Sequence, residues 1–242
     1  MGSDQQINMS DLKKVPMFWF GLMAQIMVFG GISFGSPVLA IHLGSYEGFT
    51  KAWIGFYFSA PAITYLINSL FISHICDRVH RRVVLLIGLI LFSISIYMVG
   101  TSPMLGIDDV SSTILAGLFL MGFAAVMITV PLIPEILNSI ESQLPWLEGE
   151  ELNNVISGYL NSCIGIGEAI GPIASGLLTE SLGFRHALDL AGTFILFFTL
   201  VYAICNISVG PCLREKPVDE EQDDYIRCQD PEIQTNRMLP SV

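Results

Sequence analysis

Six long stretches of the chain carry almost no charge, and this constrains the fold more than any other feature. Five of them contain no Asp, Glu, Lys or Arg, although one of these includes His74, and the sixth is interrupted only by Glu168. The stretches are 15–41, 52–76, 83–107, 110–134, 152–179 and 190–213. A helix needs only about 20 apolar residues to cross the roughly 30 Å hydrocarbon core of a bilayer. The sequence therefore predicts an all-α membrane protein with six transmembrane helices.

The composition supports this prediction, because charged residues make up only 14% of the chain, whereas soluble domains contain about 25%. We expect a cytoplasmic leader over residues 1–14 and a six-helix transmembrane domain over 15–209. Residues 210–242 form an acidic tail with too little apolar surface to order itself, so we expect it to be disordered. The predicted helices span about 15–42, 52–75, 82–104, 111–138, 152–179 and 186–209.

Lysine and arginine predict the orientation of the helices. One side of the membrane receives Lys13, Lys14, Arg78, Arg81, Arg82, Arg214 and Lys216. The other side receives Lys51 and Arg185. Because cytoplasmic loops carry an excess of these residues, we expect both termini to face the cytoplasm.

The motifs of several enzyme classes are missing from the sequence. The chain contains no phosphate-binding loop, no zinc-ligand spacing and no nucleophile elbow, and its five cysteines include no Cys-x-x-Cys pair. No basic cluster suggests nucleic acid as a partner. We therefore expect no enzymatic activity, no metal and no cofactor.

The turn after the second predicted helix carries an ordered set of charges. Its charged positions are Asp77, Arg78, Arg81 and Arg82. A carboxylate at a helix end followed by guanidinium groups can tie neighbouring helices by charge-assisted hydrogen bonds. The order resembles the loop signature of the major facilitator superfamily, G-x-x-x-D-[RK]-x-G-[RK]-[RK], with Ser73 and His80 in place of its glycines. The resemblance implies a conformational role for the four charged residues.

The fifth predicted helix carries a second motif. Its residues are Gly158, Gly167, Gly171, Pro172 and Gly176. Gly167, Gly171 and Ser175 recur every four residues, so they form one smooth face that a neighbouring helix can approach closely. Pro172 removes an amide hydrogen bond and permits a bend. The spacing resembles the antiporter motif of the same superfamily, G-x8-G-x3-G-P-x2-G-G, with Ser175 replacing one glycine. Rocking of this helix against its partner and purely static packing both fit the pattern.

Glu168 lies near the middle of the same helix, where an ionised carboxylate costs several kcal/mol unless it faces protein or water. Asn161 and Asn154 precede it at seven-residue intervals, so the three share one face, which we expect to line a polar cavity. Desolvation is expected to raise the carboxyl pKa, which suits a group that exchanges a proton for a cation. Two roles stay open: Glu168 binds a cationic substrate or a coupling proton, or it is a protonated structural carboxyl between helices.

Two further ionisable residues lie near helix ends. Glu135, close to the cytoplasmic end of the fourth helix, is a candidate for binding substrate or protons, with a solvated or salt-bridged carboxylate as the alternative. His42 closes the first helix on the far side. A proton-exchanging role and a plain interfacial histidine are both open there.

Residues 13–205 as a whole resemble one half of the major facilitator fold, and they are most similar to the carboxy-terminal six helices of its vesicular amine and polyamine transporter-like branch. A weak internal similarity between residues 29–43 and 123–137 suggests a 3+3 inverted repeat. The resemblance implies proton-driven antiport of amines or other organic cations in an endomembrane, vesicular or plasma membrane.

The superfamily normally uses two such halves with the substrate between them. Three interpretations of a six-helix chain stay open. It is a half-transporter that works as a homodimer or with a partner half, it is a truncated fragment, or it is a non-transporting subunit that keeps the fold for contacts. The first implies the bilayer, a small organic solute and protons as partners.

Overall fold

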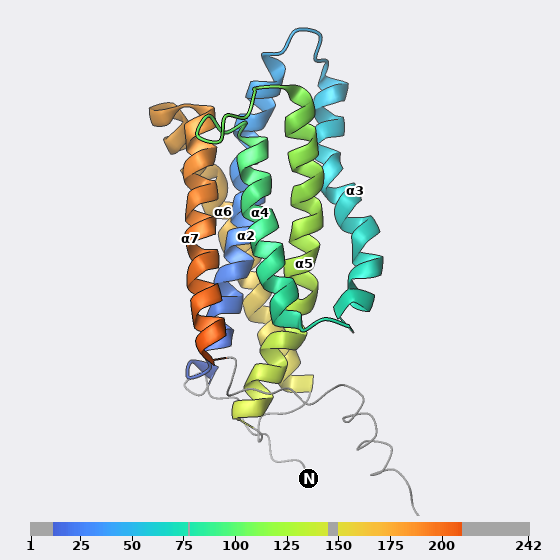
Figure 1. The fold of residues 1–242 in the computed structure, drawn as a ribbon, viewed down its shortest axis with the longest axis vertical. Coiled ribbons are helices and arrows are strands. Elements are labelled where there is room, and N and C mark those ends of the chain that lie inside the picture. Colours follow the sequence, from blue (N-terminus) through green and yellow to red (C-terminus); the bar gives the residue numbers. More distant parts are fainter. Residues whose placement is uncertain (1–11, 77, 145–149, 210–242) are drawn as a thin grey trace, which may run out of the picture. The chain divides into compact units, whose positions relative to one another are not determined.

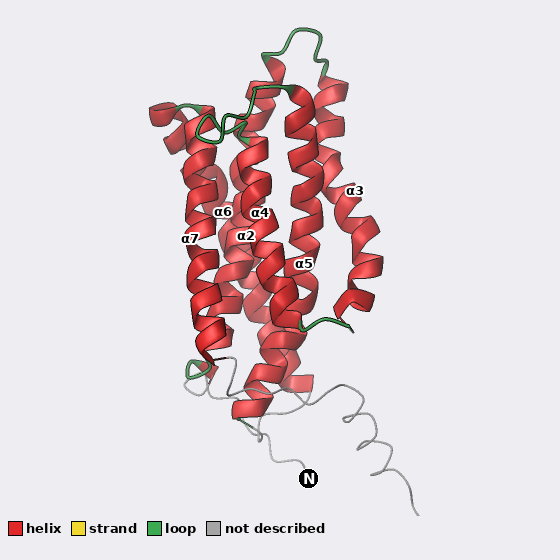
Figure 2. Ribbon diagram, viewed as in Figure 1, coloured by secondary structure: helices red, strands yellow, loops and turns green. Residues whose placement is uncertain are grey.

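The computed structural model describes residues 12–76, 78–144 and 150–209, and all the longer elements in these ranges are helices (Figure 2). The helices are α2 (Pro16–Gly44), α3 (Lys51–Cys76), α4 (Arg81–Val99), α5 (Ser111–Gln143), α6 (Glu150–Leu182) and α7 (Phe184–Val209). All six are long and apolar enough to cross a membrane. The predicted tail falls outside the described ranges, as does most of the predicted leader.

The end of α4 differs from the sequence-based prediction. The predicted helix extends to residue 104, but α4 ends at Val99 and Gly100 follows as its cap. Thr101 then adopts a φ of 45°, a left-handed conformation that β-branched residues rarely take. Its carbonyl oxygen accepts hydrogen bonds from Nε of Arg185 at 2.8 Å and from Nη2 at 2.5 Å. The start of α7 therefore holds this turn in place.

α5 extends beyond its predicted end. It continues to Gln143 and passes through Pro131 and Pro134 without interruption. Prolines are tolerated inside transmembrane helices because neighbouring helices and polar side chains satisfy the backbone groups that the proline ring leaves unpaired.

α2 and α5 lie at the centre of the helix bundle (Figure 1). α2 packs against α3, α4, α5 and α6, and α5 packs against α2, α3, α4 and α6. Fully buried side chains include Phe18 of α2, Phe92 of α4 and Leu132 of α5. Because lipid tails are as apolar as leucine, close van der Waals packing rather than the hydrophobic effect holds such helices together. Small residues at the helix contacts therefore have a large influence on the arrangement.

Two helix pairs relate the triplet α2–α4 to the triplet α5–α7. α2, the first helix of its triplet, packs extensively against α6, the middle helix of the other, and α5 packs in the same way against α3. A repeat whose halves are related by a two-fold axis requires both contacts. Glycines line each of them: Gly167 and Gly171 of α6 touch α2, and Gly122 of α5 lies directly on the backbone of Pro61 in α3. The packing agrees with the predicted 3+3 arrangement.

α7 is attached to α4 by hydroxyl groups. The Ser93 hydroxyl donates to the carbonyl oxygen of Gly192 at 2.9 Å, and the hydroxyls of Tyr97 and Thr193 are 2.8 Å apart. These interhelical hydrogen bonds satisfy polar groups that would otherwise face hydrocarbon.

Candidate functional site

α6 approaches α2 so closely that side chains are excluded between them. A Cβ atom added to Gly167 would lie 2.8 Å from the backbone nitrogen of Gly30. A Cβ atom added to Gly171 would lie 2.7 Å from the carbonyl oxygen of Gly30 and 2.9 Å from the nitrogen of Phe34. These neighbours are backbone atoms, so they cannot move aside as a flexible side chain would. Ser175, the next residue along the same line, is fully buried.

The other three residues of the glycine motif take no part in this contact. Gly158, Pro172 and Gly176 are exposed, and a Cβ atom at Gly158 or Gly176 would have no atom within 4 Å. α6 continues as a helix through Pro172. The structure therefore divides the motif into two glycines that set the α2–α6 distance and three residues on the outer surface.

Two sets of exposed residues lie at the two edges of the exposed face of α6, and Gly158, Pro172 and Gly176 lie on the surface between them. The polar flank consists of Asn154, Asn161 and Glu168, all exposed. The apolar flank consists of Ile166, Ile170, Ile173 and Leu177, which are 45–66% exposed. With 3.6 residues per turn, the two flanks lie on roughly opposite sides of the helix, and the face that packs on α2 lies between them.

The two flanks suit different surroundings. Hydrocarbon can cover isoleucine side chains, but an ionised carboxylate near the middle of a membrane helix must face protein or water. Glu168 occupies such a position in the 33-residue α6. Among the residues that the structure describes, neither Glu168 nor the two asparagines of the polar flank has a hydrogen-bond or ion-pair partner. The described helices therefore leave this flank open, and they do not by themselves enclose the polar cavity that the sequence predicts.

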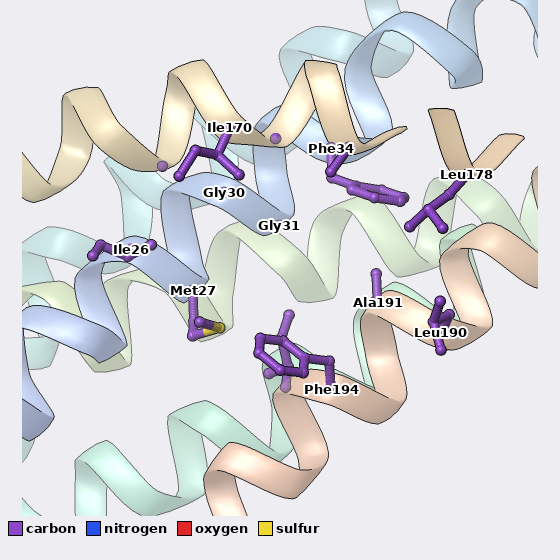
Figure 3. Close-up of a pocket in the computed structure, with 14 residues that line it drawn as sticks. Ile26, Met27, Gly30, Gly31, Phe34, Ile170, Leu178, Leu190, Ala191 and Phe194 are labelled. Atoms are coloured by element: carbon purple, nitrogen blue, oxygen red, sulfur yellow. The ribbon is translucent and has the colours of Figure 1, made fainter. Parts of the chain in front are cut away.

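A cavity of about 380 Å³ lies between α2, α6 and α7. Met27 and Phe34 of α2, Ile170 of α6 and Phe194 of α7 are among the side chains that line it (Figure 3). Every residue of the lining is apolar or glycine, so the lining offers no side chain that could pair with a charged group. The cavity borders the apolar flank of α6 and is distinct from the polar flank.

A buried ion pair joins the start of α4 to the C-terminal part of α5. Nε of Arg82 donates to Oε1 of Glu135 at 2.5 Å, and Nη2 of Arg82 lies 3.4 Å from the Ser139 hydroxyl. The Glu135 side chain is 0% exposed and that of Arg82 is 15% exposed. Of the two roles that the sequence left open for Glu135, the structure shows the salt-bridged carboxylate.

The other charged residues of the predicted loop motif have different surroundings. With its amide oriented to satisfy both partners, Asn138 of α5 accepts a hydrogen bond from Nη1 of Arg81 at 2.6 Å and donates to the carbonyl oxygen of Pro134. This contact joins the same two helices as the ion pair. Arg78 is exposed, and Asp77 lies outside the described residues.

The sequence analysis did not identify the residues that connect α7 to the loop after α4. The positive-inside rule counts Arg185 only as a charge on the predicted non-cytoplasmic side, yet its guanidinium donates to the carbonyl oxygens of Thr101 and Ile107 and so ties α7 to the loop after α4. Asp109 in the same loop accepts hydrogen bonds from Tyr46 and Thr101. The position of Arg185 in the sequence could have indicated this role. Arg185 follows the turn between α6 and α7, just as Arg82 follows the turn between α3 and α4.

Comparison with known proteins gives consistent matches. The model of the Major Facilitator Superfamily matches residues 18–227. The chain is 24% identical over 196 residues to the MFS-type transporter SLC18B1 of Rattus norvegicus, 24% over 193 residues to that of Mus musculus and 26% over 195 residues to that of Homo sapiens. These alignments cover 79%, 76% and 80% of this chain but 43%, 41% and 42% of the relatives. The chain therefore spans about two fifths of the length of these curated relatives.

The family match includes both the helices that carry the charged loop and the helix that carries the glycine motif. The six apolar helices and the paired α2–α6 and α3–α5 contacts agree with one six-helix half of that fold, as the sequence predicted. This integral, multi-pass membrane protein belongs to the major facilitator superfamily of transporters.

Proposed function

We propose that the chain forms one wall of a pathway that exchanges a small organic cation, such as an amine, for protons, and that a second six-helix unit supplies the opposite wall. Asn154, Asn161 and Glu168 line this pathway. Both ends of the chain face the cytoplasm in the proposed orientation, with Arg82 on the cytoplasmic side.

The two-flanked surface of α6 carries this proposal. Its exposed isoleucines suit hydrocarbon, whereas its exposed Glu168 requires water or protein at the same membrane depth. A water-filled pathway between two six-helix units satisfies both flanks at once. The similarity to proteins named as MFS-type transporters supports the same conclusion.

The chemistry of the polar flank suits competition between a cation and a proton. An ionised Glu168 attracts an ammonium group, and the asparagine amides can accept its N–H hydrogen bonds. Protonation of Glu168 removes the negative charge and so favours release of the cation. The close α2–α6 contact gives α6 a smooth surface against which it can shift as the pathway opens to one side or the other.

Transport by reconstituted protein tests the proposal. We expect proteoliposomes with an imposed pH gradient to accumulate organic cations, and Glu168→Gln to reduce the gradient-driven uptake roughly tenfold or more, because the amide cannot exchange a proton. Glu180→Gln is the matched control, since Glu180 is an exposed acid nearer the end of the same helix. Equal uptake by wild type and Glu168→Gln at every pH contradicts the assigned role.

The second unit is tested by the mass of the purified protein in nanodiscs. We expect two six-helix units in each transporting particle, supplied either by two copies of this chain or by this chain and a partner half. A particle that holds one copy and no partner yet transports would contradict the proposed two-wall pathway. Particles of any composition that fail to transport cations would favour a purely structural subunit.

A further inference from the structure

A network of polar side chains gathers at the non-cytoplasmic end, around Asp109 in the loop between α4 and α5. Its carboxylate Oδ1 accepts a hydrogen bond from the Tyr46 hydroxyl at 2.5 Å and from the Thr101 hydroxyl at 3.2 Å. Nε2 of His42 lies 3.1 Å from the same oxygen. His42 belongs to the last turn of α2 and Tyr46 follows the end of that helix. One carboxylate therefore joins α2 to the loop after α4.

The network also includes the start of α7. The ring of Phe184, its first residue, stacks on the ring of His42 with 4.2 Å between centroids and 15° between planes. Arg185, the next residue, binds the carbonyl oxygens of Thr101 and Ile107. Three separate parts of the chain, the end of α2, the loop after α4 and the start of α7, thus meet at the His42–Asp109 contact.

The charges around this contact keep Asp109 ionised. Burial raises the pKa of Asp109, but hydrogen bonds from Tyr46 and His42 outweigh it and hold that pKa below its ordinary value of 3.8. Burial, together with the hydrogen bond to Asp109, raises the pKa of Tyr46, so its hydroxyl stays a donor. Arg185 and Tyr57 are the other ionisable groups that act on Tyr46. The imidazole of His42 can take up a further proton, and this proton would change the charge of its contact with Asp109.

We propose that the His42–Asp109 contact is a proton-sensitive latch, which holds the non-cytoplasmic ends of α2 and α7 and the loop after α4 together more tightly when His42 is protonated. A neutral imidazole can donate one hydrogen bond to Asp109, but an imidazolium adds opposite charge to the same contact, and charge-assisted hydrogen bonds are about twice as strong as neutral ones. The latch therefore tightens when His42 takes up a proton from the solution on that side. It weakens again only when the pH falls low enough to protonate Asp109.

The latch goes beyond the proposed transport function, since it assigns a regulatory contact to an end of the bundle that holds no part of the polar flank. An acidic solution on the non-cytoplasmic side would favour closure of that end. A neutral solution would favour its opening. The contact can be measured without any transported solute, so its test and the transport test fail independently.

Hydrogen exchange of the full chain in nanodiscs tests the latch. The amide of Ser102 donates to the carbonyl oxygen of Tyr97 in α4, and the amide of Ile107 donates to the carbonyl oxygen of Ser102, so peptides that cover residues 100–110 report the opening of the loop. We expect protection factors, corrected for the intrinsic exchange rate at each pH, to be roughly fivefold higher at pH 5.5 than at pH 7.5. Peptides around Glu135 provide an internal reference, because the Arg82–Glu135 pair contains no histidine and lies outside the network around Asp109.

Three variants decide the outcome. His42→Gln keeps a hydrogen-bond donor but cannot gain a proton, so we expect it to remove the pH dependence. His186→Gln is the matched control, since His186 is an exposed histidine near the start of α7, and we expect it to behave as wild type. Asp109→Asn removes the anion and should also abolish the effect, which covers the case that His42→Gln does not fold. Equal protection factors at pH 5.5 and pH 7.5 in the wild type overturn the proposal. A pH dependence that persists in either His42→Gln or Asp109→Asn also overturns it.

Discussion

The two ends of the helix bundle are joined by different chemistry at equivalent positions of the repeat. At one end of the bundle, the start of α4 meets α5 through the Arg82–Glu135 ion pair, which is almost completely buried. At the other end, the start of α7 meets the end of α2 through Phe184 and His42, with Asp109 alongside. The helix α4 corresponds to α7 in the repeat, and α5 corresponds to α2. The two junctions are therefore counterparts.

The difference between the junctions concerns how each responds to protons. Arginine is always charged in proteins, so the guanidinium of Arg82 keeps its charge across the physiological range. The junction of α7 with α2 contains an imidazole and is partly exposed, with side-chain exposures of 18% for His42 and 34% for Asp109. The packing of the two junctions differs as well, since α4 packs extensively against α5 whereas α7 packs only sparsely against α2.

Breaking the Arg82–Glu135 ion pair should have the largest effect on the stability of the protein. Arg82→Ala leaves the buried Glu135 carboxylate without its guanidinium partner, which typically destabilises a protein by about 3–5 kcal/mol. Thermal unfolding in detergent measures the loss, which should be similar at pH 6 and pH 8. Arg78→Ala is the control, because Arg78 is exposed and should change stability by less than about 0.5 kcal/mol. Equal effects of the two substitutions would show that the ion pair is not structural.

Removing Arg185 at the other junction should have the next largest effect. Arg185→Ala deletes hydrogen bonds from a charged group to the carbonyl oxygens of Thr101 and Ile107, and because Arg185 is only partly buried and water can replace some of this bonding, we expect a total loss of about 1.5–3 kcal/mol. Because the Thr101 carbonyl lies in a strained turn, we expect faster proteolysis and faster hydrogen exchange over residues 100–110. Unchanged exchange there would mean that the turn is held by other contacts.

The α2–α6 contact belongs to neither junction, and disturbing it should destabilise the protein by an intermediate amount. Gly171→Ala forces a methyl group against backbone atoms of α2, and overpacking of this kind costs about 1–3 kcal/mol. The better helix propensity of alanine offsets up to about 1 kcal/mol of this cost. Gly176→Ala has open space around it and should be neutral or stabilising. Unfolding midpoints of the two variants provide the comparison, and a reversed order would contradict the close α2–α6 approach.

The smallest effect should come from titration of Asp109. Its lowered pKa means that the folded state holds this carboxylate ionised more strongly than the unfolded chain does. The associated stability is therefore present above the ordinary pKa of 3.8 and is lost as the pH falls through the lower folded value. Below pH 4, wild type should lose stability more steeply than Asp109→Asn. Parallel pH profiles of the two proteins would contradict the assigned hydrogen bonds.

The helices could be predicted from the sequence because membrane spans are set by length and apolar content, which are local properties. The glycine contact was also predictable in outline, since Gly167 and Gly171 recur at a helical interval. The partner helix was not, because nothing in the spacing identifies Gly30 of α2. The end of α4 was misplaced because the φ of Thr101 is held by Arg185, a residue 84 positions away.

The ionisable residues also divide into those that local spacing predicts and those whose roles depend on tertiary contacts. The row that ends at Glu168 follows from the helical interval alone, and the structure places its residues on one exposed flank. Whether Glu135 binds a solute or pairs with Arg82 depends on tertiary contact, so the sequence left it open. The role of His42 rests on Asp109 and Phe184, which are far away in the chain and carry no motif.

The central claim is that the polar flank of α6 faces water rather than lipid, and thiol labelling measures this most directly. Single cysteines would replace Asn161, Glu168, Ile170 and Ile173 in a chain whose five native cysteines are substituted. We predict that a charged, membrane-impermeant thiol reagent modifies the cysteines at 161 and 168 in intact membranes but leaves those at 170 and 173 unmodified. The account would be contradicted if the cysteines at 161 and 168 stayed unmodified by this reagent but reacted with a thiol reagent dissolved in the lipid.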